Sequence, residues 1–354
     1  MKLHIFAIEN KYDFMNISIF FRLLLLSFFI NLNAQTIRIP NNRTNFQKLD
    51  LLIQQEKNFG KDSLALQKYL QPLSKTKLYL PLHSALQANS YTNFYDRITA
   101  KSKKLYQTSI NQANILGYKP LQIWTRLNYV KRLYHYGYYQ EMQPVLLELM
   151  KDIRQTKESE IINPLDTYKT IGWIMQTLSD YPEANYYLKL ALKYCKPDNP
   201  NYASILDNYG VNLYKMRYYQ DALKHFDKSG AIALKNKDIL RYAKTLGNKA
   251  QVYEQQKKYI EAISLLKEDI ALSERLKESK NKMFASIALS RIYLKNNALT
   301  EAEDLINEAG KIASSKSYFR KWELEVVNLK LDLLKRKPNP NEEVLVSRRM
   351  MCIV

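Results

Sequence analysis

The sequence predicts an all-helical solenoid, a right-handed α-α superhelix of antiparallel helix pairs. Three observations predict it: a repeat period of about 40 residues, helical spacing of apolar residues within each repeat, and little glycine or proline. The chain has 354 residues, of which 8 are glycine and 11 are proline. This scarcity disfavours all-β folds and predicts few tight turns, so the remaining choice is a protein of long helices.

The repeat is defined by columns of small and large residues that keep register. Four alanines, each near the start of an apolar helix pattern, are spaced by 38, 40 and 40 residues: Ala184, Ala222, Ala262 and Ala302. Small residues precede them by twelve positions, at Gly172, Gly210, Ala250 and Ser290. Large residues stand nine positions before them, at Met175, Leu213, Tyr253 and Tyr293, and four positions after them, at Leu188, Phe226, Leu266 and Ile306. A fixed period of about 38–42 residues is typical of a solenoid array.

Each repeat is predicted to be a helix, a short turn and a second helix. Residues Ala302, Leu305, Ile306 and Ala309 follow the i, i+3, i+4, i+7 spacing of one helix face. The small pair lets the two helices of a repeat cross closely, and the large residues fill the space around the crossing. Two weaker copies come first: their small positions are occupied by Val130 with Met142, and by Ser90 with Ser102.

The stretch from Tyr218 to Phe226, Tyr-Tyr-Gln-Asp-Ala-Leu-Lys-His-Phe, with Gly210 ahead of it, resembles the tetratricopeptide repeat family. The resemblance covers residues 82–336. The period is longer than that family's 34 residues, the early tryptophan column is replaced, and the closing proline is absent. Such longer repeats are similar to the periplasmic portions of bacterial signalling regulators.

The two ends of the chain differ from the array. Residues 1–34 have the pattern of a secretory signal peptide: Arg22, the apolar run 23–30, a polar step and a small residue, Ala34, at the expected cut. The mature chain is therefore expected to be exported to the periplasm, with no membrane span. Residues 35–80 are expected to be irregular capping helices, 81–336 the array, and 337–354 a capping segment or tail.

The composition excludes several function classes. The formal charge is +20, which leaves open an acidic partner or lysines spread over solvated faces, and no nucleic-acid-binding motif is present. No residues have the spacing of a known catalytic motif or of metal ligands, and the four histidines are isolated from one another in the sequence. We therefore expect no enzyme activity, no cofactor and no metal. The sequence does not decide whether Cys195 and Cys352 form a disulfide, or which oligomer forms.

The resemblance implies a binding surface, because in that family the first helix of each repeat lines a concave groove. The family's groove positions in this chain include Tyr91, Tyr95, Trp124, Lys131, Tyr134, Lys169, Trp173, Asn208, Tyr214, Lys215, Lys244 and Arg291. Aromatic and cationic side chains there favour a peptide or protein partner of acidic character. The alternative is that the aromatic side chains simply fill a tyrosine-rich solenoid. Trp173 is expected on the groove wall, where Trp173→Ala would weaken binding and leave melting unchanged.

A narrower hypothesis comes from family members that grip a terminal carboxylate. Lys169, Asn208 and Lys244 fall on three of the five columns of that clamp, whereas Trp173 and Asn248 replace the other two.

The resemblance predicts a non-catalytic protein- or peptide-binding scaffold in the cell envelope, serving as the sensory or interaction part of a signalling system. The alternative is a ligand-capture component of an outer-membrane nutrient uptake system, although no lipid-anchor cysteine stands at the expected cut.

Overall fold

The computed structural model describes residues 79–315 and 320–353, all of which lie in one compact unit, Asn58–Val354. The predicted signal peptide, and the predicted cap as far as residue 78, lie outside the described residues.

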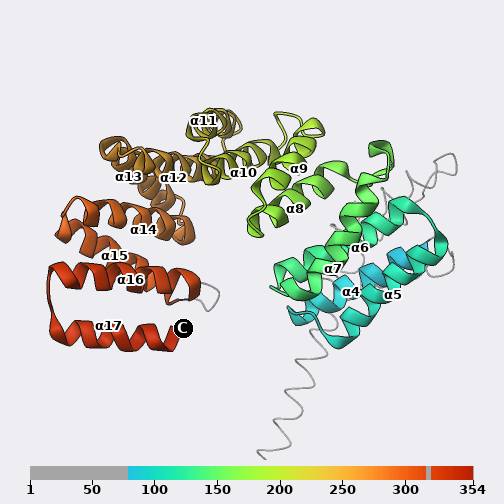
Figure 1. Ribbon diagram of the computed structural model, residues 1–354, viewed down its shortest axis with the longest axis horizontal. Helices are drawn as coiled ribbons and strands as arrows, with labels where there is room; N and C mark the ends of the chain where they lie inside the picture. Colours follow the sequence, from blue (N-terminus) through green and yellow to red (C-terminus); the bar gives the residue numbers. More distant parts are fainter. Residues whose placement is uncertain (1–78, 316–319, 354) are drawn as a thin grey trace, which may run out of the picture. The chain divides into compact units, whose positions relative to one another are not determined.

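The described chain is helical from end to end, and it contains no strand (Figure 1). The all-helical solenoid predicted from the sequence is confirmed. Its helices are α4 (Leu80–Tyr95), α5 (Ala100–Leu116), α6 (Lys119–His135), α7 (Tyr139–Arg154), α8 (Pro164–Thr177), α9 (Tyr181–Lys193), α10 (Asn201–Lys215), α11 (Tyr219–Lys235), α12 (Ile239–Gln255), α13 (Tyr259–Arg275), α14 (Ser279–Lys295), α15 (Leu299–Ala313), α16 (Arg320–Arg336) and α17 (Pro340–Ile353). A short 3-10 helix, Glu158–Glu160, lies between α7 and α8.

These helices form consecutive antiparallel pairs, from α4 with α5 to α16 with α17. Except for α7, each second helix also packs on the first helix of the next pair, and successive first helices contact one another. We call α4, α6, α8, α10, α12, α14 and α16 the first-helix row. This is the packing of a repeat array, in which each unit buries its apolar face against its neighbours.

The small-residue columns lie where the two helices of a pair cross. Ala184, Ala222, Ala262 and Ala302 are all 0% exposed. A Cβ atom built on Gly210 would lie 2.7 Å from the Phe226 ring. One built on Gly172 would lie 2.7 Å from the side chain of Leu188. The two helices therefore approach so closely that glycine opposite a large side chain is a packing requirement.

The first pair departs from the predicted register by one residue. The turn between α4 and α5 spans four residues, 96–99, whereas the turns within the next five pairs span three. Ser102 is 0% exposed, as expected, but Ser90 is half-buried and its neighbour Asn89 is 1% exposed. The longer turn thus moves the buried position of α4 from Ser90 to Asn89.

Tight turns join most of the helices, contrary to what the scarcity of glycine predicts. After α10 the Tyr218 amide donates to the Leu213 carbonyl (2.9 Å), and Arg217 adopts a left-handed φ of 66°. Lys257 (φ 61°) and Asn297 (φ 58°) hold the same place in the next two repeats. This is the hydrogen-bond pattern that ends a helix at a left-handed residue, which glycine prefers. Here arginine, lysine and asparagine accept the strained conformation because the turn's hydrogen bonds compensate for it.

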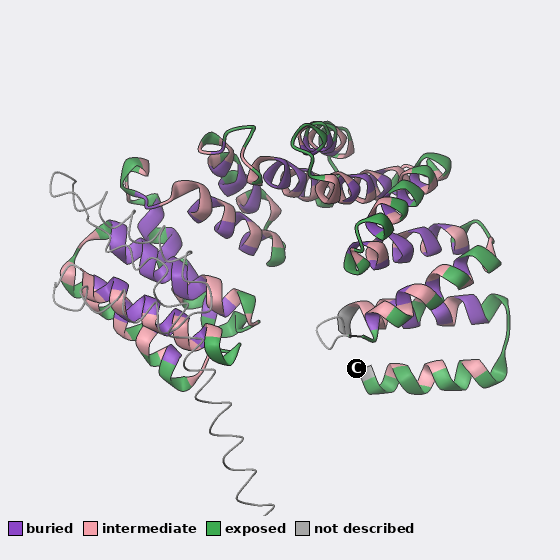
Figure 2. Cartoon of the chain, turned by 180° about the vertical axis from the view of Figure 1, so that it is seen from behind, coloured by how far each residue is buried: buried purple, intermediate pink, exposed green. Residues whose placement is uncertain are grey.

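The last helix, α17, carries no buried residue among those whose burial is described, and it is green and pink in Figure 2. It packs on α16, where Arg349 donates to Glu323 (Nε to Oε1, 3.0 Å). Residues 340–353 therefore form a helix that packs on α16. Among the described helices, none has both the length and the apolar character needed to cross a membrane.

Candidate functional site

Side chains of successive first helices bond directly to one another, beginning between α4 and α6, where Asn89 Nδ2 donates to Asn128 Oδ1 (3.1 Å). Lys131 of α6 forms an ion pair with Asp166 of α8. Lys169, one turn further along α8, reaches both Asp166 (Nζ to Oδ1, 3.4 Å) and Asn201 of α10 (Nζ to Oδ1, 3.1 Å). Asp166 offsets one of the two positive charges, so Lys131 and Lys169 share one acid of the protein.

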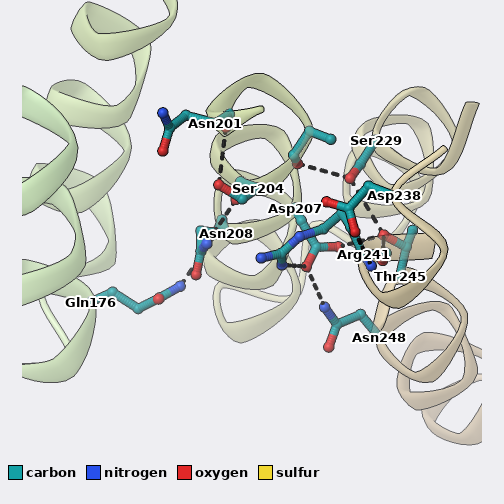
Figure 3. A network of polar contacts seen from close by, with 11 residues as sticks. Gln176, Asn201, Ser204, Asp207, Asn208, Ser229, Asp238, Arg241, Thr245 and Asn248 are labelled. Carbon is teal, nitrogen blue, oxygen red and sulfur yellow. Dashed lines mark hydrogen bonds and ion pairs between the residues drawn. The ribbon is translucent and has the colours of Figure 1, made fainter. Parts of the chain in front are cut away.

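A network of polar contacts joins α10 to α12 and centres on Asp207 (Figure 3). Its carboxylate accepts hydrogen bonds from Asn248 Nδ2 (2.9 Å), Arg241 Nη1 (3.3 Å) and Thr245 Oγ1 (3.2 Å). Ser229 of α11 lies 3.3 Å from the Thr245 hydroxyl and extends the network to the second helix. Asp207 is 3% exposed, and burial raises the pKa of its carboxyl although Arg241 favours the charged form.

A second buried acid links α12 to α14. Glu254 is 5% exposed and accepts from Lys295 Nζ (2.6 Å), while Arg291 Nη1 lies 3.7 Å from its other oxygen. Arg291 also pairs with Glu325 of α16. Acid–cation pairs thus join neighbouring first helices at four junctions: α6–α8, α10–α12, α12–α14 and α14–α16.

Other contacts show that the first helices run side by side in the same direction. Near their C-terminal ends, the Tyr136 hydroxyl donates to Asp96 (3.2 Å), and Gln176 Nε2 donates to Asn212 (2.6 Å). The hydroxyls of Tyr134 and Thr177 are 2.8 Å apart. The helix ends of neighbouring repeats therefore align, and the first-helix row offers one continuous face to a partner.

The structure divides the five predicted cations into two groups. Lys131, Lys169 and Arg291 are ion-paired within the row. Lys215 and Lys244 form no ion pair with any described residue; Lys215 Nζ lies 5.5 Å from the centre of the Tyr214 ring instead. Burial, followed by the field of Arg241, lowers the pKa of Lys244. These two lysines are the cations of the predicted set that remain available to an anion.

The predicted aromatic residues also differ in their access. Trp124, on α6, is 7% exposed, whereas Tyr95, at the end of α4, is 51% exposed. Tyr91 lies under Lys101 of α5, with Nζ 4.1 Å from the ring centre. Tyr134 and Tyr214 are half-buried, and burial raises the pKa of Tyr214. Trp124 therefore cannot contact a partner without rearrangement of α6.

Trp173 has a position different from the one expected. It is half-buried, packs against the core formed by helices α4 to α10, and its indole Nε1 is buried without an acceptor among the described residues. Lys169 Nζ lies 5.0 Å from the centre of its ring. Trp173 therefore belongs both to the row and to the core.

We accordingly expect Trp173→Ala to lower the free energy of unfolding by roughly 2 kcal/mol, less than for a fully buried tryptophan. Denaturant titration of the purified variant measures this change. Lys169→Gln serves as the control, because it removes the cation over the ring and leaves the packing. A Trp173→Ala variant as stable as wild type would show that the tryptophan contributes nothing to the core.

The three residues on the carboxylate-clamp columns are engaged to different degrees. Lys169 is held by Asp166 and Asn201. The Asn208 amide donates to the Ser204 carbonyl (2.7 Å) (Figure 3). Lys244 alone of the three keeps its charged group without a partner among the described residues. The row therefore does not present the three side chains together as a preformed carboxylate grip.

Sequence reasoning missed the acids Asp166, Asp207 and Glu254, together with Arg241. A signal existed for Asp207, which follows the apolar pair Ile205 and Leu206 on a predicted first helix. A charge in such a place requires a partner, and here Arg241 supplies it from 34 residues away in the sequence. Within the described ranges, no three histidine, cysteine or acidic residues cluster as a metal site requires.

Comparison with known proteins agrees with this geometry. Residues 243–276 match the model of the tetratricopeptide repeat. Three solved structures share the fold. The apo form of RapI has 16% identity and a TM-score of 0.65, over 85% of this chain and 84% of that one. A Rap protein complexed with competence and sporulation factor has 12% identity and a TM-score of 0.56, over 87% and 98%. The Cut9–Hcn1 hetero-tetramer of the APC/C has 16% identity and a TM-score of 0.51, over 78% and 48%.

The sequence has no match among curated proteins. The repeat columns, the pairwise helix packing and the matched repeat agree: residues 243–276 match a tetratricopeptide repeat, and the described chain has the fold of a tetratricopeptide-like helical solenoid, as its sequence predicted. Arrays of this class are typically non-catalytic scaffolds for protein interaction.

Proposed function

We propose that this protein is a non-catalytic scaffold that binds a peptide or protein along the first-helix row. The observation that supports this most is the row itself. Its helices are aligned and joined by side-chain bonds, and they carry partly exposed polar and aromatic groups such as Tyr91, Tyr214 and Lys244. A rigid face of this kind loses little freedom on binding, which favours affinity. The Rap protein complexed with competence and sporulation factor shares the fold.

The partner that fits best has acidic character. Lys131, Lys169 and Arg291 are ion-paired within the row, whereas Lys215 and Lys244 form no ion pair with a described residue. A partner carboxylate near either lysine would gain a charge-assisted hydrogen bond without displacing an acid of the protein.

The acidic-partner proposal is tested with the variant Lys215→Gln/Lys244→Gln. We expect it to remain folded and to lose most of the partner captured from an envelope extract at low salt. The matched control is Lys228→Gln/Lys267→Gln, which removes two exposed lysines from the second helices α11 and α13. Equal capture by both variants would contradict the proposal.

We further propose that the scaffold acts in the cell envelope as the sensory or interaction part of a signalling system. The N-terminal pattern of Arg22, the apolar run 23–30 and Ala34 supports export. The resemblance to periplasmic portions of signalling regulators supports the signalling role.

Export is expected to depend on the apolar run. Leu24→Lys with Leu25→Asp should leave uncleaved precursor in the cytoplasm, because each central charge disfavours insertion by roughly 2.5 to 3.5 kcal/mol. Cell fractionation and N-terminal sequencing of the product measure this, and the wild-type product should begin at Gln35. A wild-type chain that stays in the cytoplasm would contradict the proposed location.

A further inference from the structure

Lys244 is unusual among the cations of the first-helix row. It lies on α12 at the junction with α14, half-buried, and no described carboxylate forms an ion pair with it. The charged groups that act on it most are Arg241 and Lys280, which repel it, and Glu278 and Asp238, which attract it. Arg241 is itself bonded to Asp207. A desolvated ammonium beside two other cations favours an additional anion.

Aromatic side chains continue from this point across α14 and α16. Lys280 Nζ lies 5.8 Å from the centre of the Phe284 ring. The Phe284 ring in turn lies 4.4 Å from the ring of Trp322, tilted by 46°. Both rings are half-buried on a core of α14, α15 and α16, so each keeps an accessible edge. Such a pair offers apolar area to a neighbouring side chain at small entropic cost.

The cation and the aromatic pair are connected in space through Lys280, which acts on Lys244 and lies over Phe284. They occupy three consecutive first helices. Among the ring pairs of the described residues, Phe284 with Trp322 is the one that joins two first helices of the row.

We propose that Lys244, Phe284 and Trp322 form a subsite for a peptide segment in which an acidic side chain stands next to an aromatic one. This proposal rests on the proposed function and specifies the chemistry of the partner. The partner's carboxylate bonds to the Lys244 ammonium, and its aromatic ring packs on Phe284 and Trp322. Charge complementarity selects this occupant, because Lys244 is the cation of the predicted set that is partly desolvated and forms no ion pair with a described residue.

A single-stranded nucleic acid is the competing occupant, since bases stack on aromatic side chains and phosphates pair with lysines. Such binding requires several unpaired cations along the path of the backbone. At this junction Arg241 is already bonded to Asp207 and Lys282 pairs with Glu274 and Glu308, so the observations favour the peptide.

The test uses two defined probes, acetyl-aspartyl-phenylalanine amide and acetyl-asparaginyl-phenylalanine amide. The resonance of the Lys244 ε-carbon is followed by NMR in the full chain, assigned with the variant Lys244→Gln. We expect the aspartyl probe to bind roughly tenfold more tightly than the asparaginyl probe, since its contact with the ammonium is charge-assisted. Saturation with the aspartyl probe should also raise the pKa of Lys244, an effect that a purely structural lysine would not show.

Three variants refine the result. Lys244→Gln should abolish the difference between the probes, Phe284→Ala should weaken both, and Lys215→Gln should change neither. Equal binding of the two probes, no binding at millimolar concentration, or displacement of the aspartyl probe by an equimolar oligothymidine would each overturn the subsite. If the probes fail but a partner still cross-links to other positions of the first-helix row, the subsite is wrong and the proposed function stands. If no partner cross-links to any position of the row, the proposed function itself is wrong.

Discussion

Replacing Asp269 by asparagine is expected to stabilise the protein by roughly 4 kcal/mol at about pH 8, the largest effect of any substitution considered. Asp269 lies on α13 at the junction with α14 and is 2% exposed. Its Oδ1 accepts hydrogen bonds from Ser273 (3.1 Å) and Asn281 (2.6 Å), which are both neutral. Its Oδ2 occupies space opened by Gly247, where a Cβ would lie 2.6 Å away.

Burial raises the pKa of Asp269 from 3.8 to about 7, while Lys244 on α12 is the charged group that lowers it. The folded state therefore favours the protonated carboxyl. The contribution of Asp269 to stability is fully present below about pH 4 and decreases as the pH rises to about 7, where the folded form ionises. Asparagine keeps the acceptor for Ser273 and Asn281 and cannot ionise.

Denaturant unfolding of wild type and Asp269→Asn across this pH range measures the effect. The two curves should converge at low pH and separate as the pH rises. Asp304→Asn, an exposed change on α15, is the control and should follow wild type throughout. Parallel curves for wild type and Asp269→Asn would show that the buried carboxyl does not titrate in this range.

Replacing Ala222 by leucine is expected to lower the free energy of unfolding by roughly 1 to 3 kcal/mol. Ala222 is 0% exposed at the crossing of α10 and α11, in a core cluster with Phe226 and Val252. The added atoms have no free space there. Because Val252 belongs to the next repeat, the loss should extend beyond one helix pair.

Hydrogen exchange of the backbone amides measures that spread, and we expect faster exchange in α10, α11 and α12. Ala231→Leu is the matched control, since Ala231 lies on the same helix and is exposed. Equal destabilisation by the two substitutions would contradict the assignment of Ala222 to the crossing.

The repeat columns could be predicted from the sequence because packing leaves a local trace. Gly210 faces Phe226 and Gly172 faces Leu188, so each small residue required a large one at a fixed distance along the chain. A repeated period makes such pairs visible in one sequence. The same repeated columns also predicted the helix pairs and their order along the chain.

The candidate site was less predictable because its bonds between first helices join residues 32 to 43 positions apart without a periodic pattern. Asp207 accepts from Arg241 and Asn248, whereas Glu254 accepts from Lys295 at a different level of the row. The places of these lysines in the repeat could not show that Lys169 would bond to Asp166 and Asn201. Nor could they show that Lys244 would form no ion pair with a described residue. The prediction of few tight turns was wrong for a different reason. Arg217 adopts a left-handed backbone conformation that is usual for glycine, so the number of glycines underestimates the number of such turns.

Site-specific photo-cross-linking tests the central claim, partner binding along the first-helix row, most directly. A benzoylphenylalanine is placed either at Lys215, exposed on the first helix α10, or at Lys228, exposed on the second helix α11 of the same repeat. Irradiation in intact cells should give a discrete cross-linked partner from position 215 and none from position 228. A partner captured from 228 alone, or from neither position, would contradict the account.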